Sequence, residues 1–181
     1  TAGNGSSNNT GVGNSAGKFI SAGANNTCLG YFSGTNTSPF YITNESNRVV
    51  VGNTNVTNAY IQVAWTVVSD QRDKTDIEDV SYGLDFISKL RTVKFKRDNR
   101  NRYEDRVSDG SKKDEKFSYG FLAQNVIEAE KACGATDESL LVADNEDENN
   151  LKLTETNIIP ALVKALQELK AEFDAYKASH P

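Results

Sequence analysis

The sequence predicts a mixed architecture in which an all-β segment precedes an α+β domain. Residues 1–68 are expected to form a trimeric β-helix or solenoid, and residues 69–181 are expected to end in a long helix that forms a trimeric bundle. Three observations predict this division: the charged residues are concentrated in one part of the chain, the other part repeats itself, and a heptad pattern closes the sequence.

Charge sets the boundary between the two parts. The chain holds 20 Lys and Arg and 25 Asp and Glu, and of these only Lys18, Glu45 and Arg48 precede residue 69. We therefore predict one domain over 1–68 and another over 69–181. The chain has no Met at all, which suggests a piece of a longer polypeptide, and it has neither a membrane-length apolar run nor a signal peptide. We expect no membrane partner.

Residues 1–58 are dominated by Gly, Asn, Ser and Thr and contain a short internal repeat. The segment Asn8–Gly13 recurs as Asn25–Gly30, 17 positions later. Short strands between regular turns are typical of a stacked solenoid or of an interwoven triple β-helix. One chain has few apolar side chains here, so we expect three chains to share a core, with Asn and Ser side chains hydrogen-bonded at the turns. A disordered linker is the alternative.

After Arg48 the pattern becomes β-branched and aromatic. Val49–Val51 is followed by residues 59–68, which read Ala-Tyr-Ile-Gln-Val-Ala-Trp-Thr-Val-Val. Such runs indicate strands. The second run leads directly to Ser69.

Ser69 and Lys74 stand five residues apart in the polar segment that follows. A neutral lysine amine can take the proton of a serine hydroxyl, which then attacks a carbonyl carbon. The amine acts in this way only where burial or positive charge lowers its pKa from the usual value of about 10.4. Asp73 is an alternative partner for Lys74. From these residues alone, a solvated turn is the simpler interpretation.

Three segments of the second part follow one another in a recognisable order. The first is Ser69–Lys74 with Gly83–Leu90 and Val93–Lys96, the second is Tyr119–Val126, and the third is Ile159–Lys170. Together they resemble the endosialidase-type intramolecular chaperone domain of phage tailspikes and tail fibres, over most of residues 69–181.

The resemblance implies a domain that trimerises, assists the folding of the β-helical fibre upstream, and then releases itself by autoproteolysis. It implies cleavage of the Val68–Ser69 bond, with Ser69 as nucleophile and Lys74 as base, the Ser-Lys dyad of a single-turnover serine protease. The implied partners are a homotrimer and the chain's own fibre segment as folding client. The fibre part belongs in the bacteriophage virion tail, and the chaperone acts in the host cytoplasm during assembly.

The elements after the junction are predicted from periodicity. Residues 84–90 have helical spacing and 92–96 alternate as a strand does. Residues 97–116 form a charged arm, 120–130 lead from a strand or turn into a short helix, and Leu140–Val142 is a strand candidate.

Two charged segments suggest binding sites that we do not expect. Arg97, Arg100, Arg102 and Arg106 could contact nucleic acid, but acidic residues interleave with them and the net charge of the chain is -5. The acidic run 144–150 lacks the glycine and the ligand pattern of a calcium loop. We predict no nucleic acid partner, no metal and no cofactor.

The C-terminal helix is expected over residues 156–178. Its apolar residues alternate in steps of three and four and form a heptad seam, consisting of Ile159, Leu162, Leu166, Leu169, Phe173 and Tyr176. We expect this seam to associate with other copies, with packing on its own domain as the alternative. The competing function is a non-catalytic trimerisation tip that stays on the fibre and contacts a host-cell surface receptor.

Overall fold

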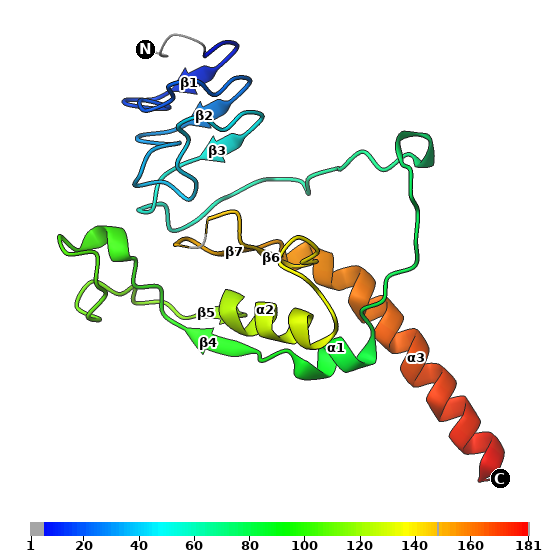
Figure 1. Cartoon of the computed structure of the whole chain (residues 1–181). Coiled ribbons are helices and arrows are strands. Elements are labelled where there is room, and N and C mark those ends of the chain that lie inside the picture. The colour runs from blue at the N-terminus through cyan, green and yellow to red at the C-terminus, as the bar shows by residue number, and fades with distance from the viewer. Residues whose placement is uncertain (1–5, 148, 181) are drawn as a thin grey trace. The chain divides into compact units, whose positions relative to one another are not determined.

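The computed structural model of the chain describes residues 6–147 and 149–180 (Figure 1). The chain divides into two compact units. One comprises the residues up to Val67 together with Asp98–Lys113, and the other comprises Val68–Arg97 together with the residues from Asp114 onward. Within the described ranges, none of the helices combines the length and the apolar character that crossing a membrane requires.

Three short strands of the first unit stack on one another (Figure 1). They are β1 (Thr10–Val12), β2 (Thr27–Leu29) and β3 (Val49–Val51). All pairings are parallel, with Thr10 beside Thr27 and Thr27 beside Val49. The 17-residue repeat therefore gives the register of the first pair, and the strands that pair belong to a single chain. The third strand follows after 22 residues and was not recognised as part of the repeat.

The interior of this stack is small. The central residues of β2 and β3, Cys28 and Val50, are buried there with Ile20 and Ile42. The flanking strand residues face outward, so Val12, Leu29 and Val51 are exposed. One chain therefore covers only one face of its three-stranded sheet.

Asparagine side chains connect successive turns of the stack. The Asn26 amide donates to Asn9 Oδ1 at 2.9 Å, and the Arg48 amide donates to Asn26 Oδ1 at 2.9 Å. Each asparagine also donates from Nδ2 to a backbone carbonyl, that of Gly23 or Glu45, at 2.8 Å. Buried backbone groups need such partners, so the expected role of asparagine at the turns is confirmed.

The strand predicted over residues 59–68 does not form. Figure 1 shows this segment as a bare line between β3 and α1, and no part of it is assigned to a strand. A strand requires a neighbour that accepts and donates its backbone hydrogen bonds. Among the residues that the structure describes, none provides such a neighbour, so the prediction is wrong for the single chain.

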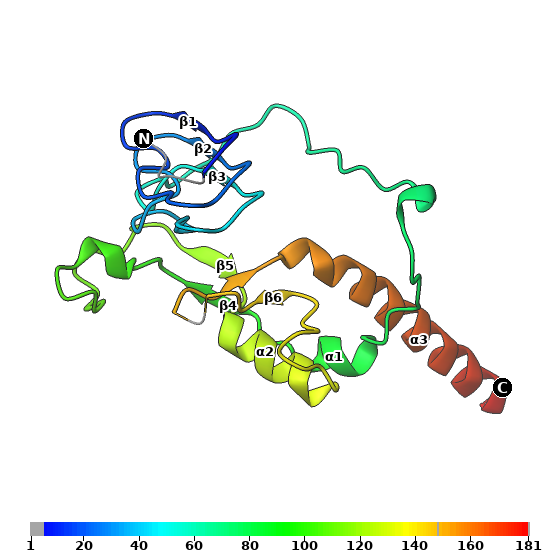
Figure 2. The ribbon, with the colours of Figure 1, turned by 45° about the horizontal axis from the view of Figure 1, so that its top comes forward.

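The second unit builds its core around a short helix. Phe86 of α1 (Leu84–Lys89) is fully buried and packs with residues of α2 (Ala123–Ala132) and α3 (Ile158–Ser179). Antiparallel β4 (Val93–Phe95) and β5 (Ser118–Gly120), and antiparallel β6 (Ala143–Asp144) and β7 (Lys152–Leu153), complete the unit. Figure 2 shows α1 against α3, whose C-terminal half extends beyond the rest of the unit.

Most of the elements predicted for this unit are confirmed. The helix over 84–90, the strand over 92–96 and the charged connection 97–116 between β4 and β5 all occur. The strand candidate at Leu140–Val142 is misplaced, because β6 begins at Ala143. The C-terminal helix begins at Ile158, after a 3-10 turn over Glu155–Asn157.

The long helix α3 carries two apolar faces. Ile158, Ala161 and Ala165 are buried, and Ile158 and Ala161 belong to the core of its own unit. The six residues of the heptad seam all remain exposed, and Leu166 is 67% exposed. The alternative that the seam packs on its own domain is therefore wrong for this chain.

A carboxylate side chain of α3 caps the N-terminus of α1. Glu168 Oε2 accepts a hydrogen bond from the Leu84 amide at 2.7 Å, and this N-terminal amide receives no capping side chain from Gly83. A Cβ atom on Gly83 would lie 2.1 Å from the same oxygen, so glycine leaves the space that Glu168 occupies. The interaction couples the helix of the heptad seam to the core helix.

Replacing Glu168 with alanine should lower the free energy of unfolding of the second unit by about 1 kcal/mol, because a helix start loses its cap. Urea unfolding followed by circular dichroism measures this change. Glu172→Ala, one turn further along the same exposed helix, is the matched control and should have little effect. Equal stability of the two variants would show that the cap contributes nothing.

Candidate functional site

The segment Ser69–Lys74 folds into a tight turn held by its own side chains. Asp70 precedes the 3-10 turn Gln71–Asp73, and its Oδ1 accepts from the Arg72 amide at 2.9 Å. The Arg72 guanidinium donates to both oxygens of the same carboxylate, from Nη2 at 2.7 Å and from Nε at 3.1 Å. The Lys74 amide closes the turn on the carbonyl of Gln71 at 3.1 Å.

This turn brings the predicted nucleophile and base together. Lys74 Nζ lies 2.6 Å from Ser69 Oγ and 3.2 Å from the Ser69 carbonyl oxygen. Distances of about 2.6–3.2 Å between the heavy atoms are those of a nucleophile and its general base. The Val68 carbonyl carbon, which the predicted reaction attacks, belongs to the peptide bond just before Ser69.

The electrostatics of the turn are dominated by the Asp70–Arg72 pair. Its hydrogen bonds hold the pKa of the Asp70 carboxyl below the ordinary value and raise the pKa of Arg72. Asp73 is exposed, and in the described part of the chain it makes no ion pair with Lys74. The predicted competition between Asp73 and Ser69 for the lysine is therefore absent from this turn.

Ser69, Lys74 and Val68 are all exposed in the single chain. A lysine becomes an effective base where burial or positive charge disfavours its charged form. The geometry of the pair is thus present in one chain, whereas the exclusion of water from the pair is not. Catalysis by this pair would require groups outside the turn to exclude water from it.

The role of Asp70 and Arg72 in forming the turn was not predicted from the sequence. A detectable signal exists, because an aspartate directly before a short helical turn is a common N-cap and an arginine two residues later can reach it.

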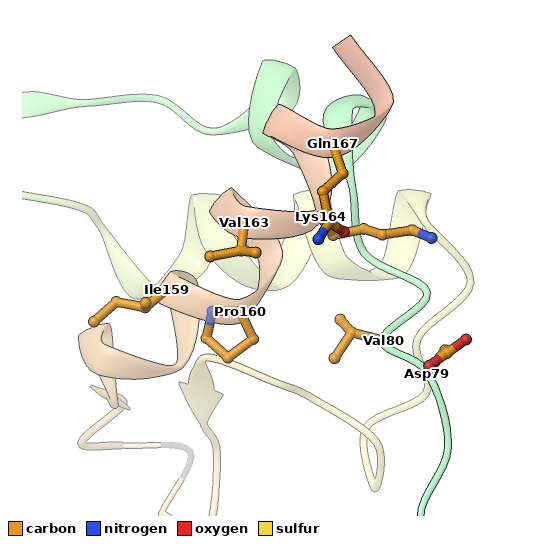
Figure 3. A pocket seen from close by; sticks show the side chains of 7 residues that line it. All are labelled: Asp79, Val80, Ile159, Pro160, Val163, Lys164 and Gln167. Carbon is orange, nitrogen blue, oxygen red and sulfur yellow. The ribbon is translucent and has the colours of Figure 1, made fainter. Parts of the chain in front are cut away.

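A separate apolar pocket of about 440 Å³ lies in the second unit, and neither Ser69 nor Lys74 lines it. Figure 3 shows its lining, with Asp79 and Val80 opposite residues of α3. Its α3 residues are Ile159, Pro160, Val163, Lys164 and Gln167. Hydrocarbon groups make up most of the lining, and its charged residues are Asp79 and Lys164.

No group of three or more His, Cys, Asp or Glu side chains that could hold a metal occurs within 6–147 and 149–180. The acidic run 144–150 includes residue 148, which lies outside the described residues. Both cysteines, Cys28 and Cys133, are free thiols.

In a comparison with protein families, residues 69–135 are similar to one family of chaperone domains. The matching family is described as chaperone of endosialidase. The match begins at Ser69 and ends after α2, and it confirms the resemblance found in the sequence. The helix α3 lies outside the matched residues, so its similarity to the closing helix of the family remains a prediction. No curated protein and no solved structure matched the chain.

Proposed function

We propose that this chain is the end of a phage tail fibre or tailspike whose chaperone domain releases itself. In this proposal residues 69–181 trimerise, assist the folding of the upstream β-helical segment 1–68, and then cut the Val68–Ser69 bond. The fibre part stays in the virion tail, and the chaperone completes its work in the host cytoplasm. The family match supports the chaperone role in a phage tail.

One observation carries the cleavage step: Lys74 Nζ lies 2.6 Å from Ser69 Oγ, next to the predicted scissile bond. Neutral Lys74 takes the hydroxyl proton, and Ser69 Oγ forms a bond to the Val68 carbonyl carbon. The bond from that carbon to the Ser69 nitrogen then breaks, and the nitrogen takes a proton from the Lys74 ammonium. The Val68 acyl group is left as an ester on Ser69 Oγ, and water hydrolyses the ester.

The exposed apolar surfaces support self-association. The heptad seam of α3 is uncovered along a helix whose C-terminal half extends beyond its unit (Figure 1). An amphipathic helix with a repeat of this kind is stabilised when two or more copies pack their seams together. A homotrimer would give three fibre segments a common axis at the point where they must fold.

A second candidate function is the non-catalytic trimerisation tip that stays attached and contacts a host receptor. The full exposure of Ser69 and Lys74 favours it, because a hydrated lysine is a weak general base. The two functions differ in whether the Val68–Ser69 bond is cleaved.

Intact mass spectrometry of the purified chain over time tests the proposal. We expect the parent chain to divide between Val68 and Ser69, Ser69→Ala to stay whole, and Lys74→Ala to divide about 10² to 10⁴ times more slowly, which is the usual contribution of a general base. Asp73→Ala is the control and should divide like the parent. A parent chain that stays whole would refute self-cleavage and favour the attached tip.

A further inference from the structure

Asp70 differs from the other residues of the Ser69–Lys74 turn in its surroundings. It is half-buried, with a side chain that is 39% exposed, whereas the other five residues of the turn are exposed. The Arg72 side chain lies across the carboxylate and donates to both of its oxygens. The guanidinium therefore fixes the orientation of the carboxylate, and Asp70 Oδ1 also accepts the Arg72 amide at 2.9 Å.

The Asp70 carboxylate takes a hydrogen bond that the backbone would otherwise make. In a 3-10 turn each amide donates to the carbonyl three residues before it, as the Lys74 amide does to the Gln71 carbonyl at 3.1 Å. By the same pattern the Arg72 amide would donate to the Ser69 carbonyl. That bond would require a helical ψ of about −20 to −30° at Asp70. Asp70 instead has an extended ψ of 136°, as an N-cap residue normally does.

Lys74 uses the acceptor that this cap leaves open. Its Nζ lies 3.2 Å from the Ser69 carbonyl oxygen as well as 2.6 Å from Ser69 Oγ. A lysine side chain is flexible, and holding it in one position costs conformational entropy. Two contacts with the same residue hold the amine better than one. A backbone bond from the Arg72 amide to this carbonyl would compete with Lys74 and would turn Ser69 away from its present place.

We propose that Asp70 is a positioning residue for the cleavage of the Val68–Ser69 bond. By accepting the Arg72 amide, its carboxylate keeps the backbone extended at residue 70 and leaves the Ser69 carbonyl to Lys74. Asp70 acts through the placement of Lys74 and takes no part in the proton transfer. The inference rests on the proposed self-cleavage and deepens it by naming the group that holds the nucleophile and the base within reach of each other.

The rate of cleavage, measured by intact mass spectrometry, gives the first test. Asp70→Ala should be cleaved about 10² times more slowly than the parent chain, which is the cost of displacing a reacting group by about 1 Å. Asp70→Asn keeps an oxygen that can accept the Arg72 amide, since asparagine and aspartate are equally good N-caps, and should remain within a few-fold of the parent. Asp73→Ala changes the other aspartate of the turn and is the matched control, which should be cleaved like the parent.

A thiol in place of the Ser69 hydroxyl reports the position of Lys74 without depending on cleavage. A nearby ammonium favours the thiolate and speeds its alkylation. In the Ser69→Cys chain, alkylation by iodoacetamide at pH 7, located by peptide mapping of uncleaved chains, should slow several-fold when Lys74→Ala is added. With Asp70→Ala present, adding Lys74→Ala should change little, whereas with Asp70→Asn it should again slow alkylation several-fold. Comparing the pairs removes the direct effect of the Asp70 charge on the thiol.

Two results of the cleavage test would overturn the inference. Asp70→Ala could be cleaved as fast as the parent, or Asp70→Asn could be as slow as Asp70→Ala, which would mean that the charge of Asp70 matters and its cap does not. Circular dichroism checks that both variants keep their helices, as expected because the hydrogen bonds described for the Asp70 side chain all come from Arg72.

A parent chain that is not cleaved would refute self-cleavage, and the thiol measurement would then decide on Asp70 by itself. An effect of Lys74 on alkylation that disappears with Asp70→Ala and returns with Asp70→Asn would support the placement of Lys74 by Asp70. An effect of equal size in all three backgrounds, or no effect in any of them, would overturn it.

Discussion

Glu130→Ala is expected to lower the free energy of unfolding of the second unit by about 3 to 5 kcal/mol. The Glu130 side chain is fully buried at the end of α2 and accepts from three consecutive amides. These are the amides of Leu141 at 2.6 Å, Val142 at 2.8 Å and Ala143 at 3.2 Å. Each buried donor left without a partner costs about 1–3 kcal/mol. A loss of this size is a large part of the stability of a small domain.

Urea unfolding of the Ser69→Ala chain measures this loss without interference from cleavage. Glu128→Ala is the matched control, because Glu128 is exposed on the same helix and should be nearly neutral. Glu130→Gln keeps one acceptor oxygen and should fall between the two. If Glu130→Ala and Glu128→Ala unfold at the same urea concentration, Glu130 does not hold the segment before β6.

Gly13→Ala is expected to cost the β stack roughly 2–5 kcal/mol. A Cβ atom on Gly13 would lie 2.7 Å from the carbonyl carbon of Gly30 in the next turn, and φ of Gly13 is +122°. Strained φ values cost about 1–3 kcal/mol for other residues, and overpacking costs about 1–3 kcal/mol. To make room, the turns must move apart and weaken the 2.7 Å bond from the Gly30 amide to the Val12 carbonyl.

Gly30→Ala is the matched control for this substitution. Its φ of +105° is similar, but its nearest neighbour, the Gly52 Cα atom, would lie at 3.4 Å, which is ordinary contact. Hydrogen exchange of peptides spanning residues 6–30 should therefore accelerate much more in Gly13→Ala than in Gly30→Ala. Equal acceleration would mean that backbone strain, and not the close approach of the turns, decides the effect.

The sequence predicts local geometry well at the junction and in the first two turns of the stack. The family resemblance predicts Ser69 and Lys74 as a pair, and their turn is a local structure because the groups that shape it lie within residues 69–74. The 17-residue repeat likewise gives the pairing of Thr10 with Thr27. The third strand was not recognised as part of the repeat for two reasons. It follows the second strand after 22 residues in place of 17, and Arg48 stands at the position that Asn9 and Asn26 occupy in the two preceding turns.

Features that depend on distant partners were not predictable in the same way. The partners of Glu130 are backbone amides, which leave no signature in the sequence. The segment 59–68 has the composition of a strand, but pairing is a property of its neighbours. On α3, the spacing of Ile158, Ala161 and Ala165 resembles the spacing of the seam, so periodicity alone does not say which face meets the domain.

The local construction of the Ser69–Lys74 turn has a consequence for timing. The hydrogen bonds described for this turn lie within six consecutive residues, so the turn can form on a nascent chain as soon as those residues have left the ribosome. In the proposed function, formation of the turn would precede assembly and would not set the moment of cleavage. If the chain cuts itself, the timing of cleavage depends on the later exclusion of water from the Ser69–Lys74 pair. A turn that is exposed to water would then be formed but inactive, which would prevent release of the chaperone before the fibre has folded.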